Sequence, residues 1–219
     1  INESYFPGER RVFWIHAASI GETNSVLPLI REIIKNDSKI FILLTTTTLT
    51  SSQIIKKQEL DQNNFQHRFF PLDVRYLVKN FLNHWNPEKI IFVDSEIWPN
   101  MILNLKKRNI PIVLLNGRIT KKSFSRWKIF SNFSKKIFGM FILCISSSKE
   151  SKKYLIELGA NNVKLIGNLK FSQSENESHK IKKELKKFLS SKKIWCASST
   201  HHSEENFCAL VHKDLKKKY

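Results

Sequence analysis

Glu22 provides a carboxylate at the end of the segment Ala18-Ser19-Ile20-Gly21-Glu22, where an apolar run ends and an amphipathic run begins. Gly21 would let the backbone turn tightly and a ligand approach, and the free N–H groups of a following helix can hold a phosphate or an oxyanion. Glu22 then belongs to a ligand site, or it only offsets the positive end of the helix dipole, which is worth ~0.3 to 1 kcal/mol. The segment alone leaves both interpretations open.

A second candidate is the segment "DSEIWPN" at 94 to 100, which places Asp94 and Glu96 after an apolar run and before Pro99. Two acids at one strand end are costly to ionise together unless one is hydrogen-bonded or protonated. We therefore expect one of the two to cap the following helix. The other carboxylate would then be available to a ligand.

Further polar groups follow two other apolar runs. Asn116 and Arg118 come after "IPIVLL", and an arginine there can make two parallel hydrogen bonds to a phosphate or pair with an acid of a neighbouring turn. The run "LLTTTTLTSSQ" contains Thr46 and Thr47, whose hydroxyls can hold sugar or phosphate oxygens, although strand propensity also explains the threonines.

Elements that alternate along the chain must position these groups. Short β-branched or aromatic runs predict strands at 12–17, 39–47, 67–72, 89–96, 110–117, 141–147 and 162–168. Lys-rich amphipathic runs predict helices at 24–35, 50–60, 74–85, 98–108, 120–138 and 148–158. This alternation indicates a doubly wound α/β domain with a parallel sheet covered on both faces, in which ligands bind at the carboxyl ends of the strands.

The helix predicted at 120–138 carries Phe124, Trp127, Phe130 and Phe133 at three-residue intervals, interleaved with lysines and arginine. A basic amphipathic helix of this kind can lie on an anionic membrane face. Its aromatic side chains can equally pack on the sheet. Both interpretations stay open.

The chain of 219 residues has a formal net charge of +18, with 37 Lys and Arg against 19 Asp and Glu. Such a charge favours anionic partners such as phosphorylated ligands, a membrane face or nucleic acid, although a biased genome also produces Lys-rich chains. The hydrophobic content of 41% excludes a disordered chain. Three widely spaced cysteines without a C-x-x-C motif favour a reducing compartment, and the longest apolar stretch is too short to span a membrane.

The composition changes after Lys170. We predict a first domain at 1–170, a polar linker and solvated helix at 171–192, and the start of a second domain at 193–219. The second domain would open with a strand at 194–200 and continue into a helix that begins with acids and ends with lysines, as the helix dipole favours. Because the chain begins at Ile1 and ends just inside this unit, we expect it to be part of a longer protein.

Six motifs in this order resemble those of the bacterial Kdo transferases, which attach 3-deoxy-D-manno-octulosonic acid (Kdo) to the lipid A precursor. They are "HAASIGE", "TTTTLTSS", "DSEIWPN", "LLNGRIT", "IGNLKFS" and "ASSTHHSEE", and the resemblance extends from about Arg11 to Glu205. It implies a GT-B glycosyltransferase fold, in which an N-terminal Rossmann-like domain binds the acceptor and a second, here truncated, Rossmann-like domain binds CMP-Kdo.

The resemblance also implies roles for individual residues. Glu22 matches the catalytic base of the S-[VI]-G-E turn, while Glu96 and Lys170 match residues associated with transition-state stabilisation. Further positions are implied in binding, the acceptor or substrate contacts being Ser19, Gly21, Thr46, Thr47, Asn116 and Arg118, and the donor contacts Ser199, Thr200 and His201. No cofactor and no metal are implied, and the pair His201-His202 lacks a third ligand at metal spacing.

Several positions depart from the family motifs. The Pro and Gly of T-P-T-G are Leu49 and Ser51, the first acid of E-T-E is Asp94, the Asp after K-F is Ser172, and the Gly of H-E-G-E-E is Ser203. None of these changes removes Glu22, Glu96 or Lys170. They affect the turn geometry and the donor contacts near Ser203.

The implied partners are CMP-Kdo, the lipid IVA acceptor and an anionic membrane surface, at the cytoplasmic face of the bacterial inner membrane. Two alternatives come from other classes. Another GT-B sugar-nucleotide enzyme, a glycosyltransferase or an epimerase, would share the alternation but not both S-I-G-E and E-I-W-P-N. A nucleic-acid-binding protein would explain the charge, yet it would present its aromatics on an exposed platform rather than within strands.

Overall fold

A computed structural model describes residues 10–58, 60, 63–167, 169, 189–190 and 193–218. Its main feature is a seven-stranded sheet in the order β3-β2-β1-β4-β5-β6-β7, in which every neighbouring pair of strands is parallel. The strands are β1 (Arg11–His16), β2 (Ile40–Thr46), β3 (Phe65–Phe69), β4 (Lys89–Val93), β5 (Ile112–Gly117), β6 (Leu143–Ser146) and β7 (Val163–Leu165). The predicted doubly wound α/β fold is confirmed.

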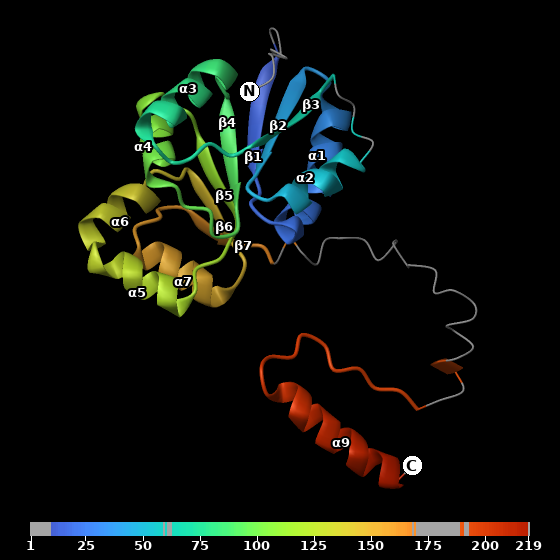
Figure 1. The fold of residues 1–219 in the computed structure, drawn as a ribbon. Helices are drawn as coiled ribbons and strands as arrows, with labels where there is room; N and C mark the ends of the chain where they lie inside the picture. The colour runs from blue at the N-terminus through green and yellow to red at the C-terminus, as the bar shows by residue number, and fades with distance from the viewer. Residues whose placement is uncertain are drawn as a thin grey trace. The chain divides into compact units, whose positions relative to one another are not determined.

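The helices alternate with these strands along the chain (Figure 1). They are α1 (Ile20–Asn36), α2 (Leu49–Lys56), α3 (Arg75–Trp85), α4 (Pro99–Lys107), α5 (Lys121–Ile129), α6 (Ser131–Phe138), α7 (Lys149–Glu157) and α9 (Glu204–Lys218). The helices α1 and α2 lie on one side of the sheet and α3 and α4 on the other (Figure 1). Both faces are therefore covered, as a sheet of apolar parallel strands requires.

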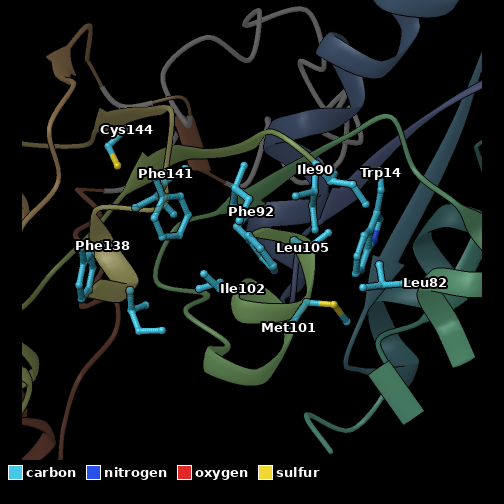
Figure 2. Packing of buried hydrophobic residues seen from close by; sticks show 14 of the residues in the cluster. Trp14, Leu82, Ile90, Phe92, Met101, Ile102, Leu105, Phe138, Phe141 and Cys144 are labelled. Carbon is cyan, nitrogen blue, oxygen red and sulfur yellow. The ribbon is translucent and has the colours of Figure 1, made fainter. Parts of the chain in front are cut away.

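The pleat of the strands divides the core into two layers. Successive side chains of a strand point to opposite faces, so Ile15 packs with α1 and α2 whereas Trp14 packs with α3 and α4. In the layer between the sheet and the helices α3 and α4, Phe92 lies between Trp14 and Phe141 (Figure 2). The centroid of its ring is 6.2 Å from that of Trp14 and 6.5 Å from that of Phe141. This aromatic layer continues along the sheet to the carboxyl ends of β1 and β4.

All seven strands of the domain were predicted, although their bounds differ by up to a few residues at each end. The helix predicted at 120–138 is wrong as a single element, because it breaks at Phe130 (φ −109°, ψ 56°) into α5 and α6. Aromatics three residues apart drift by about 60° per step around a helix of 3.6 residues per turn. One straight helix could not have turned all four toward the sheet.

The broken pair of helices both packs and exposes aromatic rings. Phe124 stacks on Tyr154 at 4.3 Å, and Trp127 meets Phe138 edge-on at 5.3 Å. Phe130 and Phe133 remain exposed. The packing interpretation of the aromatic run therefore holds for its first two rings only.

The chain divides into two compact units, Ile1–Ser174 and Glu175–Tyr219. In the second unit the predicted helix is present as α9, but the strand predicted at 194–200 is wrong, because the described residues 193–200 form no strand. A strand needs neighbours for its N–H and C=O groups, and the described part of this unit contains none. The predicted linker at 171–192 falls almost wholly outside the described residues. No described helix combines the length and the apolar character needed to cross a bilayer.

Candidate active site

The strand order reverses direction between β1 and β4, which are adjacent in the sheet although β2 and β3 separate them in sequence. In open α/β sheets such a reversal leaves a crevice outside the carboxyl ends of the two strands, where ligands bind. The segment after β1 carries Glu22, and the segment after β4 carries Asp94 and Glu96. The fold therefore places the carboxylates of both candidate segments at this reversal.

Glu22 lies in the first turn of α1 and closes a cap on that helix. Its Oε2 accepts a hydrogen bond from the Ala18 N–H (2.8 Å), and its Oε1 accepts one from the Ser19 hydroxyl (2.8 Å). Ser19 is the N-cap residue and its Oγ accepts in turn from the Glu22 N–H at 3.4 Å. This arrangement resembles a capping box, except that the Glu22 carboxylate accepts from the N–H of Ala18 rather than from that of the N-cap residue Ser19. The helix-end interpretation of Glu22 therefore describes part of its role.

The surroundings of Glu22 also change the pKa of its carboxyl group, which a helix cap alone does not require. Burial raises the pKa of its carboxyl group above the usual value of 4.5, and the negative charges of Glu96 and Asp94 add to the rise, although the hydrogen bonds from Ser19 and Ala18 oppose it. An ionised carboxylate has about four lone-pair sites, so each oxygen retains acceptor capacity beside its cap bond. Glu22 therefore combines a fixed position with increased basicity.

One oxygen of Glu96 lies within hydrogen-bond reach of two ring nitrogens. Its Oε2 accepts from Trp98 Nε1 at 2.8 Å and lies 3.3 Å from His16 Nε2. The His16 ring is fully buried, and Phe70 stacks on it at 4.0 Å between centroids. Glu96 is therefore anchored to the last residue of β1, on the other side of the strand-order reversal.

Neither Asp94 nor Glu96 caps the following helix, so that expectation is wrong. The cap of α4 comes from Asp73, whose Oδ2 accepts from the Asn100 N–H (3.0 Å) and whose Oδ1 accepts from the Met101 N–H (2.8 Å). Asp73 lies 27 residues before Asn100. A cap supplied from so far away in the sequence leaves Glu96 available to the site.

Two residues that end neighbouring strands adopt the left-handed backbone conformation. Asp94 after β4 has φ 62° and Asn116 in β5 has φ 55°, and both are buried. Asp and Asn tolerate this region better than other residues with a side chain, and such backbone strain clusters at functional sites. The tight turn expected at Gly21 is not found, because Gly21 lies within α1 and has no positive φ.

Asn116 and Arg118 lie on a cleft of about 390 Å³ at the carboxyl end of β5. Arg118 is exposed and forms no ion pair with any residue that the structure describes. Of the two alternatives for Arg118, the ion pair with an acid of a neighbouring turn is therefore not seen among these residues. The cleft is lined by Asp94, Asn116, Arg118, Ile119, Thr120, Lys121, Ser147, Ser148, Glu150 and Ser151.

The threonines at the end of β2 and just after it lie in different surroundings. Thr46 is buried and its Oγ1 lies 2.9 Å from His67 Nε2, while the exposed Thr47 hydroxyl donates to the Ala18 carbonyl at 3.0 Å. Thr45, which was not singled out, is in register with His16 and touches its ring. Substrate contacts at Thr46 and Thr47 stay predictions.

Sequence reasoning missed His16, Thr45 and Trp98. Their signal was present, since a histidine ended an otherwise apolar strand and a tryptophan followed Glu96 by two residues. What the sequence lacked was the register that sets His16 beside both Thr45 and Phe92.

Other predicted residues are not brought to this site by the described structure. Lys170 lies outside the described residues, but the N–H of Leu169 just before it donates to Asn116 Oδ1 at 3.2 Å. Ser199, Thr200 and His201 belong to the second unit, where the His201 N–H donates to Glu204 Oε2 at 2.8 Å. Ser203, which replaces the motif glycine, keeps a positive φ of 78°.

Solved structures define the class of this fold. The chain aligns with S. aureus MnaA, from a co-structure with UDP, at a TM-score of 0.56 and 11% identity, covering 82% of this chain and 51% of that one. The UDP-GlcNAc 2-epimerase of Neisseria meningitidis bound to UDP-GlcNAc aligns at a TM-score of 0.50 and 14% identity, covering 73% and 47%. The fold is the Rossmann-like half of the architecture shared by GT-B glycosyltransferases and such epimerases.

Sequence relatives specify the family within that class. The family model described as 3-deoxy-D-manno-octulosonic-acid transferase (kdotransferase) matches residues 2–173, so the chain belongs to the Kdo transferase family. The 3-deoxy-D-manno-octulosonic acid transferases of Rickettsia bellii and Haemophilus influenzae are 33% and 31% identical over 95% and 94% of the chain. A relative from Arabidopsis thaliana named "Probable 3-deoxy-D-manno-octulosonic acid transferase, mitochondrial" is 34% identical over 93% of it. The chain spans about half the length of the curated relatives it matches, with 47% to 49% of each covered.

Proposed function

We propose that this chain is the acceptor-binding half of a glycosyltransferase that moves Kdo from CMP-Kdo to the lipid A precursor lipid IVA. The observation that carries the proposal is Glu22, a half-buried carboxylate of raised pKa fixed at the strand-order reversal of a Kdo transferase fold. A general base works best when its pKa lies near the working pH, and burial moves Glu22 in that direction.

In the proposed reaction the Glu22 carboxylate takes the proton of an acceptor sugar hydroxyl. The hydroxyl oxygen forms a bond to the anomeric carbon of Kdo, while the bond from that carbon to the phosphate oxygen of CMP breaks and CMP leaves with the electron pair. Attack opposite the leaving group inverts the anomeric configuration. The chain's own groups supply base and binding contacts, and no metal or cofactor takes part in the proposal.

The supporting roles follow the motif matches. We assign Lys170 and Glu96 to the stabilisation of the charged transition state, and Ser19, Gly21 and Arg118 to acceptor contacts. The hydrogen bond from the Leu169 N–H to Asn116 Oδ1 brings the residue just before Lys170 to the end of β5. The donor contacts at Ser199, Thr200 and His201, and the domain bounds 1–170, 171–192 and 193–219, are part of the same proposal.

The direct test is transfer of Kdo from CMP-Kdo to lipid IVA by the full-length protein, followed by mass spectrometry of the lipid. Formation of Kdo-lipid IVA with release of CMP is the expected result. Conversion of UDP-GlcNAc in a parallel reaction, without Kdo transfer, would instead favour an epimerase of the same fold. Retention on DNA or RNA without either reaction would favour a nucleic-acid-binding protein, which we do not expect.

We further propose that α5 and α6 contact the anionic cytoplasmic face of the inner membrane, where the lipid acceptor resides. Ile129, Phe130 and Phe133 are 74%, 66% and 42% exposed, so three large apolar side chains are exposed within five residues of the chain. The same two helices carry exposed cations at Lys121, Lys122, Arg126, Lys128, Lys135 and Lys136. Exposed apolar side chains together with lysines and arginine are typical of a protein surface that inserts shallowly among anionic lipids.

Replacing Lys121, Lys122 and Arg126 by Glu is expected to weaken binding to vesicles with anionic lipid at least ~10²-fold, because each cation near such a surface contributes roughly 1 kcal/mol. Vesicle sedimentation at low and high salt measures the effect. The matched control changes Lys79, Lys106 and Lys107 to Glu, since these exposed lysines carry the same charge on α3 and α4. Equal losses in both variants would show a general charge effect and contradict the docking of α5 and α6.

A further inference from the structure

His16 is a buried polar residue that the proposed reaction does not use directly. It ends β1 with no exposed surface, in register with Thr45 of β2 and Phe92 of β4. Its Nε2 lies 3.3 Å from Glu96 Oε2, and its Nδ1 lies 3.0 Å from Thr45 Oγ1 and 3.1 Å from the Thr45 carbonyl oxygen. The ring therefore bridges three neighbouring strand ends.

The partners of Thr45 determine which nitrogen of His16 carries the proton. The indole N–H of Trp14 can only donate, so Thr45 Oγ1 accepts from it at 2.8 Å and has its own hydrogen left to donate. His16 Nδ1 lies within reach of that hydrogen. An unprotonated Nδ1 accepts it, and in the neutral ring the proton then resides on Nε2, where it points at Glu96.

The opposite tautomer would leave two contacts unfavourable. With the proton on Nδ1, the lone pair of Nε2 would face the Glu96 carboxylate oxygen at 3.3 Å. The Thr45 hydroxyl would also lose Nδ1 as its acceptor. A proton on Nδ1 could be donated to the Thr45 carbonyl oxygen 3.1 Å away, but that oxygen already accepts from the Ala17 N–H at 3.0 Å. Buried polar groups without partners are costly, so the contacts as a whole favour a hydrogen-bond chain that runs from Trp14 through Thr45 and His16 to Glu96.

Aromatic packing prevents the ring from leaving this position. Phe70 stacks on His16 at 4.0 Å, and Phe92 and Trp98 meet it edge-on at 5.9 and 6.4 Å. Trp98 also donates its own N–H to the same Glu96 oxygen. Two ring N–H groups on rigid supports therefore hold Oε2, while Oε1 makes no hydrogen bond to the residues that the structure describes.

We propose that His16, protonated on Nε2, is a positioning residue that fixes Glu96 so that its Oε1 accepts a hydrogen bond from a hydroxyl of the bound sugar. The role in turnover rests on the proposed function, whereas the hydrogen-bond chain itself does not. His16 acts through Glu96 and does not touch the reacting atoms.

The first test is nuclear magnetic resonance of the chain labelled with ¹⁵N-histidine. The His16 signal is assigned by its loss in His16→Gln among the seven histidines. The pattern expected for the neutral ring is a protonated Nε2 beside an unprotonated Nδ1. The His16 signals should move in Glu96→Gln, while those of His84 on the surface of α3 stay unchanged. A proton on Nδ1 instead of Nε2 would overturn the proposal.

The second test separates orientation from binding in the full-length protein. His16→Leu is expected to lower kcat for Kdo transfer about 10²-fold with KM within about twofold, because a misplaced group near the reaction costs about that factor. His16→Gln should recover most of this loss, since its amide can place an N–H near the position of Nε2. His84→Leu is the matched control for the change of residue type.

The outcomes of the two tests distinguish the inference from the function. Circular dichroism shows whether His16→Leu is folded. If it is not, the kcat of His16→Gln is compared with that of His16→Asn, whose amide cannot reach Glu96, and this comparison gives the same test. A kcat unchanged in the folded variant, or a rise in KM alone, would refute the positioning role. If the wild-type protein transfers no Kdo, the proposed function fails, and the tautomer measurement still decides the hydrogen-bond chain.

Discussion

Glu22→Gln is expected to lower kcat for Kdo transfer by roughly 10²- to 10⁴-fold, the usual contribution of a general base. Glutamine is nearly the same size, and its amide oxygen can still accept from the Ala18 N–H while its NH₂ group donates to Ser19 Oγ instead of accepting from it. The substitution therefore removes the basic carboxylate with little change to the helix. Single-turnover rates with saturating lipid IVA measure the effect.

The control for this substitution is Ser19→Ala, which removes the N-cap hydroxyl and leaves the carboxylate. It should cost about 0.5 to 2 kcal/mol in the free energy of unfolding, as N-cap replacements do. Since Ser19 is itself proposed to contact the acceptor sugar, the effect of Ser19→Ala on kcat/KM is measured as well. Wild-type turnover in Glu22→Gln would mean that Glu22 is only a helix cap.

The raised pKa of Glu22 also gives a stability signature with a definite sign. A carboxyl group whose pKa is higher in the folded state than in the unfolded one binds its proton more tightly when folded. The wild-type protein therefore loses stability as the pH rises from the unfolded pKa through the raised folded pKa of Glu22. Glu22→Gln has no such loss, so its Tm relative to wild type should increase from about pH 4 to pH 7. A difference that falls over this range would contradict the burial of an ionised Glu22.

Trp14→Ala is expected to lower the free energy of unfolding by about 3 to 5 kcal/mol, the range for large aromatic side chains removed from a core. Trp14 is fully buried and its ring lies 4.8 Å from Phe81 and 5.8 Å from Phe70. Trp14→Phe keeps much of this packing but removes the N–H bonded to Thr45, which costs about 1 to 3 kcal/mol when a buried partner is left unpaired. Urea titrations followed by circular dichroism give both values.

The comparison for Trp14 is Phe133→Ala on α6, where the ring is 42% exposed. A surface position should change the free energy of unfolding by only about 0.5 kcal/mol. Similar losses in Trp14→Ala and Phe133→Ala would mean that the aromatic layer between the sheet and α3 does not dominate the core.

The arrangement of the strands could be predicted because it depends on local pattern. Apolar runs such as that of β2, buried along its whole length, show on their own that both faces of the sheet are covered. Once the strands are parallel, the carboxyl ends and their polar turns lie at one edge of the sheet. The positions of Glu22 and Glu96 follow from this reasoning.

What could not be predicted depends on contacts between residues far apart in sequence. The cap of α4 by Asp73 spans 27 residues, and the pairing of His16 with Glu96 spans 80. The side of the sheet that each threonine of β2 faces depends on the bounds of the strand to within one residue, which propensity does not supply. Local reasoning therefore did not find Thr45, which the structure sets beside His16.

The position of β1 between β2 and β4 has a consequence for how the protein is made. A ribosome releases β1, β2 and β3 in succession, but β4 follows only at Lys89–Val93, so the second edge of β1 stays open through that interval. Open strand edges are where nascent chains pair with one another. The growing domain can therefore pair wrongly at this edge of β1 until β4 emerges, and the insertion of β4 that closes the edge is also what first brings Glu96 to Glu22.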